Sequence, residues 1–307
     1  MYTNSLLLVI KLNVYTTTEI FSQVKKVCYS LQLSRRHNWR GPKLYDQHQL
    51  VTLLILKAKY NLSLRRFVAW LNETKWPEAI GLREIPSYST VYRAFQRIGL
   101  SVLRQINDTI VQVLKSTQKA IDGTGINMSC RSRHYEKRAK LDYLPNGKLD
   151  ILADVEHYVI IDWQFTVRER HDAFVARRIL RRAKKVENNF LWADKGYDSE
   201  KLHELAFNKG YILLAPVRRS TRKRPKGHFR QRVTELLAQQ PLNQRPKIET
   251  TISILKRVYG ETIRARLSGM KKKEMAWKII AMNIDQVRKN IIFLFYLLTI
   301  RNRAKAS

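Results

Sequence analysis

Three short segments of the sequence carry carboxylates of the kind that hold hard divalent cations. Asp122 and Asp194 each come at the end of a short apolar run, and Glu249 lies in a helical pattern between Arg245 and Lys256. Carboxylate oxygens are the ligands that Mg²⁺ prefers, and two such ions can flank one phosphodiester. In a strongly basic protein, three converging carboxylates indicate Mg²⁺-dependent chemistry on the phosphates of a nucleic acid.

The residues around Glu249 fall into two groups when the segment is read as a helix. At about 100° per residue, Arg245 and Lys256 both lie within about 40° of Glu249 and form one polar stripe with it. The apolar residues fall on the neighbouring side and are expected to face the core; they are Ile248, Ile252, Leu255 and Tyr259. The pattern predicts a helix that packs on one side and presents an Arg-Glu-Lys row at its edge.

The charge balance favours a polyanionic partner. The 307 residues include 58 Lys and Arg against 25 Asp and Glu, for a formal net charge of +33 and an isoelectric point of about 10.4. Such a charge repels itself in a compact state, so DNA or RNA is the leading partner and an anionic membrane surface the second. A hydrophobic content of 44% predicts a sizeable core, and the length allows one large domain or two to three small ones.

The cysteines and the apolar runs favour a cytoplasmic, nucleoid-associated protein that does not enter membranes. Cys28 and Cys130 form neither a CxxC motif nor a disulfide framework. The runs 6–10 and 291–300 are too short to span a membrane, which takes about 20 apolar residues. No signal peptide is evident at the N-terminus. The run from Ile291 to Ile300 is expected to pack in the core or to join two copies of the protein.

The N-terminal third reads as helical. Residues 1–44 are poorly defined, and residues 45–114 show three short helices followed by a connecting helix. Ser63 is expected to cap the second helix, and Ser87 or Ser89 the third, because serine is a preferred residue at helix starts.

The third of these helices has one polar face. Its pattern directs Val91 and Phe95 inward, and Arg93 and Arg97 outward. Three short helices with an arginine-bearing last one suit a helix-turn-helix-like DNA-binding module. The plainer alternative is any small helical subdomain.

The pattern changes near residue 115, and residues 115–290 read as an α/β domain. The expected order is strand, strand, strand, helix, strand, helix, strand and a final helix, which implies a mixed sheet with flanking helices. The first strand is expected to end at Asp122, and the others to cover 149–155, 158–167, 189–193 and 211–215.

Two arginine-rich segments are expected to grip the DNA backbone. One follows the first strand and carries Arg131 and Arg133. The other is a basic loop at 216–234 that carries Arg218, Arg219, Arg222, Lys223 and Arg224 and has no acidic residue. Residues 291–307 form a C-terminal tail that is first apolar and then basic.

Together, the three carboxylate segments resemble those of the DDE transposases of bacterial and archaeal insertion sequences. The Arg-x3-Glu-x6-Lys spacing around Glu249 is similar to the third motif of that family, and the segment 193–199, Ala-Asp-Lys-Gly-Tyr-Asp-Ser, to its second. The resemblance covers about residues 45–290 and implies a ribonuclease H-like catalytic domain. It also implies a transposase that uses Mg²⁺, with Mn²⁺ as an alternative, to cut element ends and transfer the strands into target DNA.

The resemblance assigns roles to five residues. It implies that Asp122, Asp194 and Glu249 are the catalytic residues and metal ligands, and that Arg245 and Lys256 bind phosphates near the scissile bond. Because an element has two ends to be cut and joined, a homodimer on double-stranded DNA is expected.

Two positions leave alternatives open. The family usually has a tyrosine three residues before the arginine, where this chain has Leu242. A degenerate or domesticated copy that binds DNA without cleaving it therefore stays open, as does a ribonuclease H-like nuclease that cuts without rejoining. His171 and Asp172 match another feature of the family, and either contact metal or DNA or cap the following helix.

Overall fold

The computed structural model describes the backbone of residues 17–36, 44–128, 138, 146–168, 170–217, 227–239 and 244–306. The chain forms two compact units. Unit 1 comprises Met1–Ile110 and Ala276–Ser307, and unit 2 comprises Val111–Met275. Among the described helices, none is both long and apolar enough to cross a membrane.

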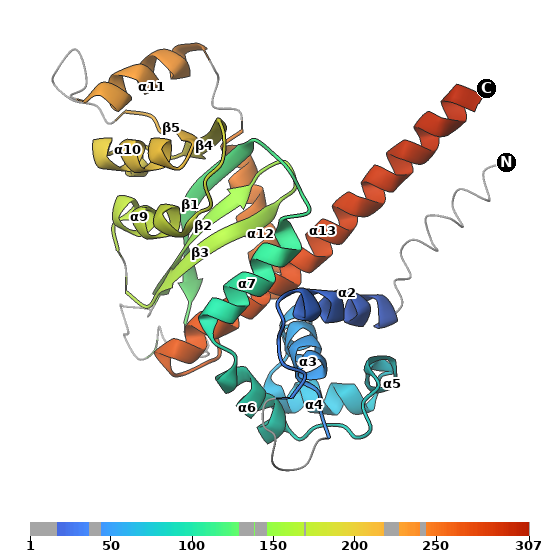
Figure 1. The fold of residues 1–307 in the computed structure, drawn as a ribbon. Helices are drawn as coiled ribbons and strands as arrows, with labels where there is room; N and C mark the ends of the chain where they lie inside the picture. Colours follow the sequence, from blue (N-terminus) through green and yellow to red (C-terminus); the bar gives the residue numbers. More distant parts are fainter. Residues whose placement is uncertain are drawn as a thin grey trace. The chain divides into compact units, whose positions relative to one another are not determined.

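Unit 1 is built from helices (Figure 1). They are α2 (Thr17–Ser30), α3 (Gln47–Lys59), α4 (Leu64–Asn72), α5 (Trp76–Ile80), α6 (Tyr88–Arg97) and α7 (Leu100–Val111), together with the part of α13 (Ser268–Ala306) that follows Met275. The two ends of the sequence meet inside this unit. Lys59 Nζ lies 2.5 and 2.7 Å from the carboxylate oxygens of Asp285, and the buried Asn283 donates to Asn107 Oδ1 at 2.7 Å.

Two serines begin the helices that the sequence assigns to them. Ser63 Oγ accepts a hydrogen bond from the backbone amide of Arg66 at the start of α4. Ser87 Oγ accepts one from the amide of Thr90 at the start of α6, which decides between Ser87 and Ser89. Each side chain satisfies an amide that has no partner within its own helix, which stabilises a helix by about 1 kcal/mol.

Helix α5 occupies a segment whose sequence is typical of a loop. Pro77 stands in its first turn, where the missing amide proton of proline costs nothing, and Gly81 ends it with a left-handed φ of +69°. Five residues are too few to show a helical period, so the proline and glycine are the only sequence signals for this element.

Unit 2 is organised by one five-stranded mixed sheet, which confirms the predicted α/β class and the ribonuclease H-like order of elements. Its strands are β1 (Gln118–Asn127), β2 (Asn146–Asp154), β3 (Val159–Thr166), β4 (Asn189–Ala193) and β5 (Tyr211–Leu214), in the spatial order β3-β2-β1-β4-β5. β1, β2 and β3 pair antiparallel, whereas β4 and β5 run parallel to β1.

Helices cover both faces of the sheet (Figure 1). They are α9 (Asp172–Arg182), α10 (Glu200–Asn208), α11 (His228–Gln239) and α12 (Pro246–Tyr259), with a short 3₁₀ helix η1 (Lys195–Tyr197) after β4. Ile121, Leu152 and Leu191 form one core cluster with residues of α9 and α10. α12 contacts β1 and lies on the other face.

Strand β1 is longer than the sequence predicts. It does not end at Asp122 but continues to Asn127, so Asp122 lies in the middle of a strand. The extension is held by β2, which pairs with β1 along its whole length from Lys119–Asp154 to Asn127–Asn146. Glycine disfavours a strand when taken alone, and the two glycines in this segment account for the wrong boundary.

Helix α11 begins inside the segment that the sequence assigns to the basic loop 216–234. Its first turn is fixed by acidic residues of the chain preceding and starting α10. The carboxylate of Glu200 accepts from the amides of Phe229 and Arg230, and the buried Asp198 holds the Arg230 guanidinium at 2.7 and 2.6 Å. These partners are about 30 residues away in sequence, and a local charge pattern cannot reveal them.

Candidate active site

Two neighbouring parallel strands bring Asp122 and Asp194 to the same level of the sheet. Ile121 of β1 pairs with Ala193, the last residue of β4, and each aspartate is the next residue along the chain. Since successive side chains of a strand alternate between faces, Asp122 lies on the face opposite to Ile121 and its core cluster. That is the face covered by α12, which carries Glu249.

Asp122 stands in a partly buried and crowded position. Its Oδ1 accepts from the backbone amide of Gly123 at 2.8 Å. Burial is the main cause that raises the pKa of this carboxyl above its usual value; the carboxylates of Asp194 and Asp172 add to the rise, while the Gly123 amide and Arg245 oppose it. The carboxylate of Asp122 is therefore partly withdrawn from water, which disfavours its ionised form in the absence of a bound cation.

Asp194 follows β4 and begins η1. Its Oδ1 accepts from the backbone amide of Lys195 at 2.7 Å, which anchors one oxygen of the carboxylate to the turn. Its side chain is 43% exposed, so it remains accessible to a ligand from solvent.

Arg245 connects the third carboxylate to the second. Its Nη2 atom lies 3.9 Å from Asp194 Oδ2 and 3.9 Å from Glu249 Oε1. No more than twice that distance can separate the two acidic oxygens. The Glu249 side chain is 63% exposed, and Lys256 is partly exposed in the last turn of the same helix.

The packing of α12 explains why its polar row faces this way. All four residues assigned to the core face, Ile248, Ile252, Leu255 and Tyr259, are buried, which confirms that prediction. Because this apolar stripe fixes the rotation of α12, the adjacent edge that carries Arg245 and Glu249 is presented beside β1 and the end of β4.

The donor set fits a divalent cation. Three carboxylates offer hard oxygen ligands, and burial raises the pKa of Asp122, whose ionised form is poorly solvated there. A divalent cation would offset that cost and would favour the ionised form of each acid. Asp122, Asp194 and Glu249 are the residues that would hold it.

Several residues that the sequence assigns to DNA lie outside the described residues. These are Arg131, Arg133, Arg218, Arg219, Arg222, Lys223 and Arg224, together with Leu242. Arg93 and Arg97 are described, and both are exposed on α6 of unit 1, with Val91 and Phe95 buried as predicted.

The structure gives Asp172 a partner that the sequence does not reveal. Asp172 is the first residue of α9 and His171 is its N-cap, so the pair does begin a helix. The Asp172 carboxylate forms an ion pair with Lys148 of β2, which also lies 3.4 Å from Asp150. Lys148 and Asp150 are two residues apart and therefore share one face of β2. Only the pairing of β2 with β1 shows that they lie on the sheet face opposite to Asp122 and close to it.

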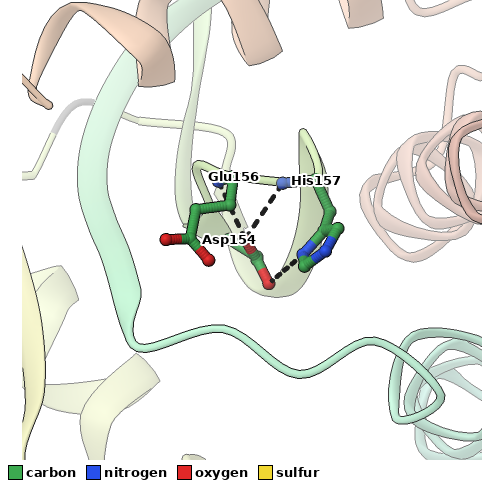
Figure 2. A group of neighbouring side chains, drawn as sticks. All are labelled: Asp154, Glu156 and His157. Atoms are coloured by element: carbon green, nitrogen blue, oxygen red, sulfur yellow. Dashed lines mark hydrogen bonds and ion pairs between the residues drawn. The ribbon is translucent and has the colours of Figure 1, made fainter. Parts of the chain in front are cut away.

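A second acidic group lies on the turn between β2 and β3 (Figure 2). Ligand atoms of Asp154, Glu156 and His157 lie within 4.8 Å of one another, a spacing that could hold a cation. The Asp154 carboxylate, however, already accepts from Lys119 Nζ at 3.0 Å and from the amides of Glu156 and His157 at 2.9 and 3.1 Å.

These partners already satisfy the charge and the hydrogen bonds of the Asp154 carboxylate without a metal. Although burial acts to raise it, Lys119 and His157 hold the pKa of Asp154 below its usual value. Asp154 pairs with Lys119, three residues before Asp122 on β1. We therefore interpret this group as the satisfied end of a hairpin, separate from the carboxylates around Arg245.

Comparison with known proteins was made for sequence and for structure. The family model described as "Transposase DDE domain" matches residues 115–284, more than half of the chain. A piggyBac transposase in a synaptic complex with hairpin DNA is 12% identical, with a TM-score of 0.43 over 92% of this chain and 74% of that one. The sequence matches none of the curated proteins.

Proposed function

The chain belongs to the family of proteins with a transposase DDE domain, and from this premise we propose that it is a DNA transposase of insertion-sequence type. It cuts DNA at the ends of an element and joins the freed strands to target DNA. Asp122, Asp194 and Glu249 are the proposed catalytic residues. The proposal rests above all on the position of Arg245: its Nη2 atom lies 3.9 Å from Asp194 Oδ2 and 3.9 Å from Glu249 Oε1.

The three carboxylates hold divalent cations in the proposed reaction, Mg²⁺ or Mn²⁺. When bound, such ions activate a water or a DNA 3′-hydroxyl and stabilise the leaving oxygen. The partial burial of Asp122 keeps its carboxylate out of bulk water, which strengthens its interaction with a cation. The exposed Glu249 leaves room for a DNA strand to approach from the α12 side.

Arg245 and Lys256 orient the substrate in this proposal. The planar fork of a guanidinium matches phosphate oxygens, and an ammonium acts as a point charge. With DNA present, Arg245 would exchange its two distant carboxylate contacts for a phosphate close to the scissile bond. The net charge of +33 supplies the non-specific attraction that brings duplex DNA to the site.

Recognition of element ends is proposed for unit 1. The exposed arginines of α6, Arg93 and Arg97, would meet the major groove or its phosphates, and α4 would cross the backbone. Two copies of the protein would hold the two ends of the element.

The decisive experiment uses the DNA that flanks the gene. The full-length protein is incubated with Mg²⁺ and duplexes that carry short inverted repeats from both flanks. We expect 3′-hydroxyl cleavage products and products joined to a target plasmid. Cleavage without joining would mark a nuclease, and binding without cleavage a degenerate copy; either outcome contradicts the proposal.

The three acids should be required for cleavage and not for binding. We expect Asp122→Asn, Asp194→Asn and Glu249→Gln each to lower the cleavage rate by at least about 100-fold, because even an outer-shell partner of a metal typically costs 10- to 100-fold. Affinity for end DNA should change little, since phosphate contacts by Lys and Arg dominate it. Glu204→Gln on the exposed side of α10 is the matched control and should cut at the normal rate.

A further inference from the structure

A partly buried ion cluster lies on the α9 face of the sheet, behind the strand that carries Asp122. Lys148 Nζ donates to the backbone carbonyl of Arg170 at 2.8 Å and to the Asp172 carboxylate, and lies 3.4 Å from Asp150 Oδ1. Asp150 is completely buried, and its oxygens have no hydrogen-bond partner among the described residues. One ammonium group therefore serves two carboxylates.

The pairing of β1 with β2 places this cluster against the catalytic strand. Asp150 stands opposite Gly123, the residue that follows Asp122. Asp150 and Lys148 share the face of Leu152, which belongs to the α9 and α10 core cluster, whereas Asp122 points to the other face. The cluster and the proposed metal ligand are thus separated by the thickness of the sheet.

Two glycines of the catalytic segments make room for the cluster. A Cβ atom on Gly123 would lie 2.9 Å from both Asp150 Oδ1 and Lys148 Cε, and a Cβ on Gly196 would lie 2.7 Å from Asp172 Oδ2. Gly125, in contrast, has nothing within 4 Å of that position. The backbone therefore lies close to the ion cluster one residue after Asp122 and two residues after Asp194.

The cluster reaches the second segment through buried contacts as well. Tyr197, three residues after Asp194, is 1% exposed and belongs to the same core cluster as Ile121. Burial is the main cause that raises the pKa of the Tyr197 hydroxyl well above its usual value, and the charges of Asp150 and Asp122 add to the rise.

We propose that Lys148, Asp150 and Asp172 are positioning residues that set the spacing of Asp122 and Asp194 for the divalent cation. They touch neither DNA nor metal; they hold Gly123 and Gly196, and through them the backbone of both aspartates. The inference rests on the proposed function, because the spacing matters only if these aspartates bind a cation. Asp172 joins the start of α9 to this cluster, which gives the aspartate of the His171-Asp172 pair a role in the reaction.

The test compares two lysines on the same pair of strands. Lys148→Met removes the ammonium of the cluster. Lys119→Met removes the ammonium that pairs with Asp154 at the other end of the β1–β2 ladder; the Lys148 and Lys119 side chains are 16% and 8% exposed. Both changes leave a buried acid without its cation, so both should lower the melting temperature of the full-length protein. Asp172→Asn, a milder change at a 38% exposed side chain, keeps the test usable if Lys148→Met does not fold.

Two Mg²⁺ concentrations are measured. The first gives half of the rise in melting temperature that Mg²⁺ causes in the protein without DNA. The second gives half of the maximal rate of end cleavage. We expect Lys148→Met and Asp172→Asn to raise both concentrations about 10- to 100-fold, as loss of an outer-shell partner does. Lys119→Met should leave both within about twofold of the wild type, and affinity for end DNA should be unchanged in all three.

Equal Mg²⁺ responses of the Lys148→Met and Lys119→Met proteins would overturn the positioning role while leaving the proposed function intact. The positioning role would also be wrong if Asp172→Asn responds to Mg²⁺ as the wild type does. A wild-type protein that neither responds to Mg²⁺ nor cuts end DNA would overturn both proposals together.

Discussion

At the scale of single residues, Asp150 is a fully buried acid whose oxygens have no hydrogen-bond partner among the described residues. Burial is the main cause that raises the pKa of its carboxyl to about 7; the charge of Lys148 opposes the rise, and those of Asp172 and Asp122 add to it. The charged groups that act on it are Lys148 of β2 and Asp172 of α9 on its own face of the sheet, and Asp122 of β1 on the opposite face. A carboxyl with such a pKa changes its charge within the physiological range of pH.

This pKa predicts how stability depends on pH. Between the unfolded pKa of about 3.9 and the folded value, the native protein keeps a proton that the unfolded chain has lost. The free energy of unfolding should therefore fall as pH rises from 4 to about 7 and stay flat above it. In metal-free buffer, urea unfolding of the wild type should lose about 2–4 kcal/mol over that range relative to Asp150→Asn. Parallel pH profiles of the two proteins would show that Asp150 titrates normally.

The residue types and their spacing are enough to predict Asp122, Asp194 and Glu249 as site residues, because the three motifs can be recognised from the order and spacing of residues along the chain. They are not enough to find Lys148 and Asp150. Lys148 and Asp150 lie near the catalytic segment because they pair with Gly125 and Gly123, respectively. This pairing exists only because β1 extends beyond Asp122. Glycines near catalytic acids suggest room for backbone or ligand, whereas the structure places side chains of the chain itself beside Gly123 and Gly196.

At the scale of elements, strongly periodic segments are predictable and short or remotely held ones are not. The face of α12 and the start of α4 follow from local patterns. β1 is predicted too short because its second half depends on β2, and the helical start of α11 depends on Glu200 and Asp198. In each failure, the stabilising partner lies far away in the sequence.

The exposed arginines of α6 should affect how the affinity for DNA depends on salt concentration. Removing one phosphate contact lowers the slope of log affinity against log salt concentration by about 1. We expect Arg93→Ala and Arg97→Ala each to weaken binding to element ends, and at least one of them to flatten that slope. Lys26→Ala removes the same charge from the exposed side of α2 and should change neither quantity. Fluorescence anisotropy with end DNA and random duplex over a range of salt concentrations measures both. Indistinguishable effects of the three changes would exclude α6 as the recognition element.

At the scale of the whole molecule, pairing of two copies is the main open prediction. α13 runs as one helix of 39 residues from Ser268 to Ala306, and it contains the apolar run from Ile291 to Ile300. Ile291 and Phe293 are 36% and 61% exposed, and the side chains that follow lie outside the described ones. Apolar surface left open on a strongly basic chain is expected to meet another copy.

Truncation tests this pairing. A protein that ends at Asn290 should bind end DNA as a monomer, whereas the full chain should hold two ends in one dimeric complex. Light scattering coupled to gel filtration, with and without end DNA, gives the molar masses. If the shortened protein still forms a dimeric complex of the same mass, the dimer contact lies elsewhere and the run only packs within its own chain.

The contacts of Lys59 with Asp285 and of Asn107 with Asn283 also bear on how the protein is made. Unit 1 is built from two separate stretches, Met1–Ile110 and Ala276–Ser307, while unit 2 is the one uninterrupted stretch between them. On the ribosome, the sheet can be complete while the helices before it still lack Asn283 and Asp285, which are synthesised after unit 2. Domains generally fold as units during synthesis. A premature stop codon after residue 275 would therefore spare unit 2 and leave unit 1 unfinished, so the nascent chain would gain its proposed catalytic centre before its proposed means of choosing DNA.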